Sequence, residues 1–183
     1  MTCIVGYIDE KNRKMYMGGD SFGVDSEDHY RSFVSDKVFV KENMLFGFTS
    51  SYRMGQLIQY KLVIPEQKEI TDSEYIATVF TDSVIKCFKD NKYLANKEGV
   101  ITGGSFLIAY KGVLYALQDD FSMVIVKNGY GSVGCGRMVA LGALEIASKL
   151  DIPVEKKIKK AIKAVKKYDS LVGGPVKIVS CEY

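Results

Sequence analysis

After Met1 the sequence reads Thr2-Cys-Ile-Val-Gly-Tyr-Ile8, and Lys14-Met-Tyr-Met-Gly-Gly-Asp-Ser21 follows after a short polar run. β-Branched and aromatic residues are frequent in the first segment, as is typical of strands, and the second segment resumes an extended pattern. The intervening polar run is short enough for a hairpin, so we predict two antiparallel strands here. Two further apolar segments, 37–40 and 44–48, flank a polar turn and predict a second hairpin after a loop over 21–35.

Runs of helices and strands alternate along the rest of the chain. Apolar residues recur at helical spacing in four segments, 52–62, 71–88, 137–150 and 154–168. Extended patterns occupy most of 104–133 and the segment 176–180. Segregated runs of strands and helices favour a layered α+β fold over a parallel βαβ sheet. We therefore expect two antiparallel sheets packed face to face, with a helix pair on each outer side.

The composition is that of a soluble globular protein. The chain has 183 residues, 47% hydrophobic and 26% charged, and we expect residues 1–183 to form a single domain. The net charge of +3 is too small to indicate nucleic acid as a partner. No apolar run approaches the roughly 18 residues of a membrane-spanning helix, and the N-terminus does not have the pattern of a secretory signal.

The four cysteines are far apart in the sequence, at Cys3, Cys87, Cys135 and Cys181. This spacing argues against a structural zinc site and against a secreted disulfide framework. A reducing, cytoplasmic setting is therefore expected, with no metal and no organic cofactor.

Thr2 is a candidate nucleophile. A threonine hydroxyl needs a base to take its proton, and the chain has one histidine, His29, in a polar loop without clustered partners. Removal of Met1 would make the α-amine of Thr2 that base, with an unperturbed pKa near ~8. The alternative is that Thr2 is simply the first residue of a strand.

Asp20 and Lys37 are candidate partners of Thr2. Asp20 follows the paired glycines 18 and 19, which permit close backbone approach, and it would project from the end of a strand. Lys37 begins the next extended segment, and a cation there would favour the deprotonated form of a nearby amine or hydroxyl. The alternatives are a turn residue and a solvated edge-strand lysine.

These segments resemble proteasome β subunits and the bacterial proteasome-like threonine peptidases of the HslV type. The resemblance begins at Thr2–Gly6, 18–21 and Lys37-Val38, and continues at Gly47-Phe-Thr-Ser50. Later segments, Val133-Gly-Cys-Gly136 and Tyr168-Asp-Ser-Leu-Val-Gly-Gly174, are similar to the family's Gly-Ser-Gly and Asp-x-x-Ser-Gly-Gly motifs. The match extends over essentially the whole chain and implies a four-layer αββα sandwich, the N-terminal-nucleophile hydrolase fold.

The resemblance implies roles for six residues. Thr2 would act as nucleophile and, through its amine, as base, while Lys37 would pair with Asp20 and tune the hydroxyl of Thr2. The backbone N–H of Ser50 would lie in the oxyanion hole. Cys135 would take the place of the family's serine beside the amine, supported by Asp169.

The sequence also departs from the family's pattern. Ser50 replaces a glycine, Cys135 replaces a serine, and Val172 stands where the family has a hydroxyl that helps to orient the amine. We expect a threonine peptidase that hydrolyses peptides or unfolded proteins in a homo-oligomeric ring, with an ATP-dependent unfoldase as a possible partner in the family's manner. The alternatives are a catalytically inactive assembly protein of the same fold and an amidohydrolase acting on a small molecule.

Overall fold

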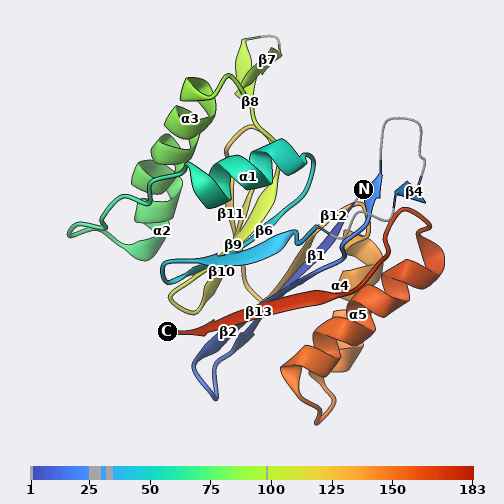
Figure 1. Ribbon diagram of the computed structural model, residues 1–183. Helices are drawn as coiled ribbons and strands as arrows, with labels where there is room; N and C mark the ends of the chain where they lie inside the picture. The colour runs from blue at the N-terminus through green and yellow to red at the C-terminus, as the bar shows by residue number, and fades with distance from the viewer. Residues whose placement is uncertain (1, 25–29, 32–34, 98) are drawn as a thin grey trace.

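Two antiparallel sheets pack against each other, and helices cover their outer faces (Figure 1). The computed structural model describes residues 2–24, 30–31, 35–97 and 99–183. The first sheet has the order β12-β1-β2-β13, formed by Tyr130–Gly134, Cys3–Asp9, Lys14–Gly19 and Lys177–Glu182. The second sheet has the order β11-β10-β9-β6-β5, formed by Met123–Val126, Val113–Leu117, Phe106–Tyr110, Met44–Phe48 and Val38–Lys41.

Two groups of helices form the outer layers. The second sheet is covered by α1 (Tyr52–Tyr60) and by a continuous helical stretch made of α2 (Asp72–Tyr75), the π-helical segment η1 (Ile76–Phe80) and α3 (Thr81–Asp90). The first sheet is covered by α4 (Arg137–Ser148) and α5 (Val154–Tyr168). Figure 1 shows the two helical layers on opposite sides of the sheets.

Alternation along β1 explains how one strand serves two cores. Cys3 and Val5 pack against α4 and α5, whereas Ile4 and Ile8 face the second sheet. Successive side chains of a strand point to opposite faces, so a strand buried on both faces is apolar throughout. The sheets approach so closely that a Cβ on Gly47 would lie 2.3 Å from the Ile4 side chain.

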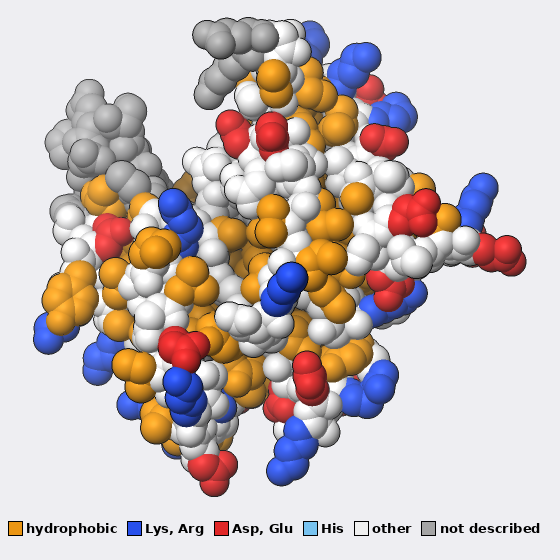
Figure 2. Space-filling model, turned by 180° about the vertical axis from the view of Figure 1, so that it is seen from behind, with side chains coloured by type: hydrophobic (Ala, Val, Ile, Leu, Met, Phe, Trp, Pro, Cys, Tyr) orange, Lys and Arg blue, Asp and Glu red, His pale blue; other side chains and the backbone are white. Residues whose placement is uncertain are grey.

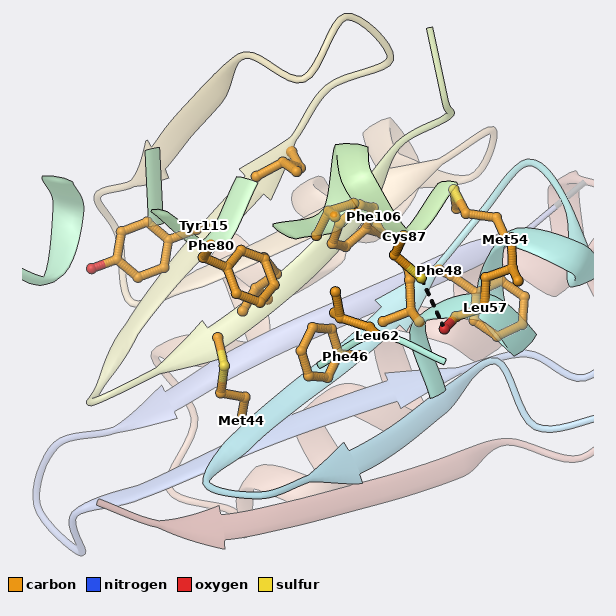
Figure 3. Packing of buried hydrophobic residues seen from close by; sticks show 14 of the residues in the cluster. Met44, Phe46, Phe48, Met54, Leu57, Leu62, Phe80, Cys87, Phe106 and Tyr115 are labelled. Atoms are coloured by element: carbon orange, nitrogen blue, oxygen red, sulfur yellow. Dashed lines mark hydrogen bonds between the residues drawn. The ribbon is translucent and has the colours of Figure 1, made fainter. Parts of the chain in front are cut away.

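The core beneath α1 and α3 is rich in aromatic residues (Figure 3). Phe46, Phe48 and Phe106 project from the second sheet toward Leu57 of α1 and Phe80 of η1. All five are at least 95% buried, and a fully buried Phe or Leu contributes about 1.5–3 kcal/mol of transfer free energy. This packing fixes α1, and with it the loop that precedes α1, against the end of β6.

The predicted αββα sandwich is confirmed, with several local differences. Two short strand pairs were not predicted: β3 (Gly23–Val24) with β4 (Tyr30–Arg31), and β7 (Ala95–Lys97) with β8 (Val100–Thr102). Strands of two or three residues are too short to produce a readable alternation. The π-helical segment was not predicted either; at its C-terminal end the hydroxyl of Thr81, the first residue of α3, donates to the carbonyl of Ile76 at 2.6 Å.

The surface is mixed in character. Figure 2 shows hydrophobic side chains in separate groups among charged ones on the rear face. Helix α4 contributes several exposed apolar side chains, Met138, Val139 and Ile146 among them. Within the described residues, every helix is too short or too polar to span a bilayer.

Candidate active site

The carboxylate of Asp20 is the centre of a buried polar cluster. Asp20 follows β2 and is fully buried. Its carboxylate accepts one hydrogen bond from each of four residues. These donors are the amide of Cys3 at 2.9 Å, the Nζ of Lys37 at 3.0 Å, the amide of Phe22 at 3.3 Å and the amide of Gly173 at 3.4 Å. These four donors come from separate segments of the chain, so the carboxylate ties the start of β1, the end of β2, Lys37 and the segment after α5 together.

Lys37 and Asp20 form a buried ion pair. Lys37 lies one residue before β5, is 2% exposed, and places its Nζ 3.0 Å from the Oδ2 of Asp20. Burial lowers the pKa of the Lys37 ammonium, while the Asp20 carboxylate acts in the opposite direction. Lys37 therefore holds its proton less tightly than a surface lysine, and it stays in place because of Asp20.

Thr2 immediately precedes β1 and is 6% exposed. Its backbone nitrogen donates to the Sγ of Cys135 at 3.4 Å, and that thiol donates to the carbonyl of Thr2 at the same distance. The neighbouring Gly134 has a φ of +101°, and a Cβ there would lie 2.1 Å from the Thr2 carbonyl oxygen. Any other residue at 134 would displace Thr2, so this glycine sets the position of the N-terminus.

Cys135 and Asp169 lie on the side of Thr2 that carries its nitrogen. Loss of water around the sulfur raises the pKa of the Cys135 thiol, and the nearby Asp169 carboxylate raises that pKa further. Asp169 is the C-cap residue of α5, and its Oδ1 accepts the amide of Leu171 at 3.0 Å. Val172 is buried among apolar side chains and supplies no hydroxyl.

The adjacent Cys3 thiol is a poor rival nucleophile. Its side chain is fully buried, and burial raises the pKa of the thiol to about 12. Since the thiolate is the reactive form, Cys3 is inert at neutral pH.

Ser50 lies in the same region. It has a φ of +62°, the left-handed conformation that favours glycine, and it precedes Ser51, the N-cap of α1. Within the described part of the chain, the Ser50 amide makes no backbone hydrogen bond, unlike the amides of Thr49 and Ser51 on either side. That N–H is thus available to a ligand.

A pocket of about 60 Å³ joins these groups. Thr2, Lys37 and Ser50 line it together with six further residues, Phe22, Gly23, Phe48, Thr49, Ser51 and Tyr52. The structure thus gathers Thr2, Asp20, Lys37, Ser50, Cys135 and Asp169 at one end of the sandwich, around the start of β1. Met1 and His29 lie outside the described residues.

Sequence reasoning missed three contributors to this site. Gly134 could have been found from its proximity to Cys135 in a glycine-containing turn. Phe22 was placed in a loop without a role, and Tyr52 was read only as the start of a helix. The signal for Tyr52 is the N-cap residue Ser51, which predicts that the helix begins at Tyr52. The first turn of that helix then lies beside Ser50, which is a candidate site residue.

The fold and the position of Thr2 define a class: the chain has the proteasome-like N-terminal-nucleophile hydrolase fold. Three solved structures carry this conclusion. BPH from Thiobacillus denitrificans, in complex with epoxomicin, matches with a TM-score of 0.80 at 14% identity, over 99% of this chain and 98% of that chain.

Eukaryotic HslV from Trypanosoma brucei matches with a TM-score of 0.71 at 14% identity, over all of both chains. Anbu (ancestral beta-subunit) from Yersinia bercovieri matches with a TM-score of 0.66 at 13% identity, over all of this chain and 82% of that chain. No protein-family model and no curated protein matches the sequence. The similarity is therefore one of fold.

Proposed function

We propose that this chain hydrolyses peptide bonds with Thr2 as an N-terminal nucleophile after Met1 has been removed. The observation that carries the proposal is that Thr2, Lys37 and Ser50 line one pocket, with Lys37 held by the buried Asp20. An attacking hydroxyl, a cation and a free N–H are the groups that acyl transfer requires.

In the proposed reaction, the α-amine of Thr2 takes the proton of the Thr2 hydroxyl while its oxygen attacks the peptide carbonyl. The Ser50 N–H stabilises the oxyanion, and such a donor lowers the activation barrier by about 2.7–4 kcal/mol. The ammonium of Thr2 then protonates the leaving amine, which leaves an acyl ester on Thr2. Water, deprotonated by the same amine, hydrolyses that ester and restores the free hydroxyl.

The remaining residues would hold and tune these groups. The Lys37 ammonium lowers the energy of negative charge developing on the Thr2 oxygen, and Asp20 fixes the place of Lys37. Cys135 contacts the nitrogen of Thr2 and would orient its lone pair, with Asp169 beyond it. A thiol is a weaker hydrogen-bond donor than a hydroxyl, so we expect this orientation to be looser than a serine would give.

The test is peptide hydrolysis by protein that begins at residue 2. Thr2→Ala is expected to lose all hydrolysis above background, whereas Thr2→Ser, which keeps a hydroxyl on an N-terminal residue, should retain a measurable rate. Thr78→Ala, on the exposed side of the helical stretch, is the matched control and should be unchanged. Hydrolysis that survives Thr2→Ala would show that another group performs the reaction.

A second candidate function is a catalytically inactive protein that keeps the fold for assembly. The buried, apolar Val172 and the thiol of Cys135 favour it, because both stand where the family has hydroxyls near the amine. An amidohydrolase acting on a small molecule is the third. Absence of hydrolysis over a broad peptide panel, from folded and assembled protein beginning at Thr2, would favour the second candidate.

We further propose that the protein works as a homo-oligomeric ring in the cytoplasm. All four cysteines are free thiols, which suits a reducing compartment. An ATP-dependent unfoldase is proposed as partner on resemblance alone, and co-purification from the native host tests it.

The exposed face of α4 is the proposed subunit contact. Met138 and Ile146 are 70% and 68% exposed and are two helical turns apart, with Gly142 between them on the same face. Met138→Glu with Ile146→Glu is expected to convert the assembled protein to smaller species, because carboxylates would be buried without partners. Light scattering measures the mass, and Val63→Glu, at a 76% exposed position off this helix, is the control. A parent protein that is monomeric at micromolar concentration would contradict the ring.

A further inference from the structure

The outer face of α5 carries lysines that are not interleaved with acidic residues. Residues 156–168 contain seven lysines and no aspartate or glutamate. The whole chain has 25 lysines and arginines against 22 acidic residues, so the chain outside this segment is net negative. Figure 1 shows α5 in an outer layer, and its apolar side chains pack toward the first sheet. A solvated helix face usually mixes both signs of charge, whereas this one is uniformly positive.

Two of these lysines have a structural role, but the central ones do not. Lys157 and Lys166 each donate to a backbone carbonyl, at 3.1 and 2.7 Å. Lys159, Lys160 and Lys163 are exposed, and within the described residues they make no hydrogen bond or ion pair through their side chains. Like charges three and four residues apart repel on a helix. The central lysines therefore destabilise α5, and no described carboxylate offsets their repulsion.

A groove of about 820 Å³ lies along these lysines. Five lysines of α5 line it together with Ala164 and Val176, and no acidic side chain does so in the described part of the chain. A lysine side chain is apolar up to its ammonium, so the groove combines apolar walls with positive charges. This combination fits a ligand that has carboxylates next to short apolar groups.

The spacing of the lysines matches that of an extended polypeptide. Lys159, Lys163 and Lys167 follow one another at four-residue intervals, so each lies about 6 Å further along the helix axis than the one before. Every second side chain of an extended chain points the same way, at intervals of about 6.6 Å. Carboxylates at alternate positions of an extended segment can thus meet successive lysines of the groove.

Other anionic partners fit this groove less well. Arginine, which binds phosphate through two donors, and aromatic rings, on which bases stack, are absent from the described residues that line it. On a second copy of the chain, several carboxylates already pair with a lysine of their own chain, among them Asp72, Asp90 and Glu145. An acidic segment without lysines has no such internal competition.

We propose that the groove along α5 is a docking site for an extended segment of a partner protein, with carboxylates at alternate positions. Each carboxylate pairs with a lysine and reduces the repulsion between neighbouring lysines, so docking stabilises α5. The described residues that line the groove and those that line the pocket beside Thr2 are different. Docking at this surface therefore does not depend on the proposed hydrolysis.

Fluorescence anisotropy with labelled octapeptides tests the proposal. In the first peptide glutamate alternates with alanine, in the second the same residues form one block of glutamate, and in the third glutamine replaces glutamate. We expect the alternating peptide to bind most tightly and the glutamine peptide at least about tenfold more weakly, with affinity falling as salt is added, because salt screens exposed charges. Equally tight binding of the block peptide, or of the glutamine peptide, overturns the proposal.

Glutamine substitutions at the central lysines assign the binding to the groove. Lys159→Gln combined with Lys160→Gln and Lys163→Gln should weaken binding of the alternating peptide about tenfold. Glutamine and lysine have similar helix propensities, and the substitutions remove repulsion. The thermal midpoint of the triple variant should therefore equal or exceed that of the parent, so that lost binding does not reflect unfolding.

A second triple variant controls for net charge. Lys61→Gln combined with Lys68→Gln and Lys89→Gln makes the same charge change at exposed positions away from α5, and should leave the affinity unchanged. Equal weakening in the two variants would contradict a specific site. Tighter binding of a single-stranded DNA octamer than of the alternating peptide would instead identify a nucleic-acid surface. A smaller mass by light scattering in the α5 variant alone would show that a second copy covers this face. Each of these results overturns the proposal.

Discussion

Protein that begins at Thr2 is expected to hydrolyse peptides about 10²–10⁴ times faster than protein that retains Met1. With Met1 attached, the nitrogen of Thr2 is an amide without a basic lone pair, and the hydroxyl lacks its proton acceptor. Removal of Met1 creates an amine with an unperturbed pKa near ~8 beside the sulfur of Cys135. The buried Lys37 cation favours the neutral, basic form of that amine.

Kinetics on two matched preparations measure this effect. One preparation carries an N-terminal fusion that a specific protease removes to leave Thr2 first, and the other retains Met1; intact mass verifies each N-terminus. Equal rates in the two preparations and in Thr2→Ala would eliminate the N-terminal threonine mechanism.

Asp20→Asn is expected to destabilise the folded protein by about 3–5 kcal/mol, the usual cost of breaking a buried ion pair from one side. The substitution leaves the Lys37 ammonium without its counter-charge at a site that is 2% exposed. For a domain of this size, that cost corresponds to a fall in the thermal midpoint of about 6–20 °C. Differential scanning calorimetry measures the midpoint, and hydrolysis should fall as well because Lys37 loses its position.

An exposed ion pair provides the control for Asp20→Asn. Lys86 and Asp90 lie one turn apart on α3 with side chains 76% and 56% exposed, so Asp90→Asn should lower the thermal midpoint far less than Asp20→Asn does, because water screens the exposed pair. The double variant Asp20→Asn with Lys37→Met should recover part of the lost stability, since no unpaired charge is then buried. A similar fall in the thermal midpoint of Asp20→Asn and of Asp90→Asn would mean that the buried ion pair stabilises the fold no more than an exposed pair does.

The layers of the fold could be predicted because most strands and helices have a readable period. Strand β1 alternates between two cores, and α5 carries buried Ile158 and Ile162 on one face, with lysines on the other. Features that depend on a single local contact were less predictable. The π-helical turn is accompanied by a hydrogen bond from the Thr81 hydroxyl to the carbonyl of Ile76, which no periodicity announces. The pairs β3–β4 and β7–β8 are too short for any period.

The site was predictable only where the residues carry chemistry of their own. Asp20 and Lys37 are charged residues next to apolar strand segments, so the change from apolar to charged residues can be recognised in the sequence. The amide of Gly173 and the side chain of Tyr52 give no such signal. They reach the site because distant segments pack together, which spacing along the chain does not encode.

The hydrogen bonds to Asp20 make the site a late product of folding. Three of its four donors are within 17 residues in the sequence, but the amide of Gly173 is 153 residues away. A chain still emerging from the ribosome and lacking its C-terminal segment cannot complete this cluster. Contacts of such long sequence separation form slowly, because the entropic cost of closing a large loop comes before the contacts can stabilise the chain. An unfinished or truncated chain would thus hold the candidate nucleophile without its ordered surroundings, and the proposed hydrolysis would require protein that is synthesised and folded to its end.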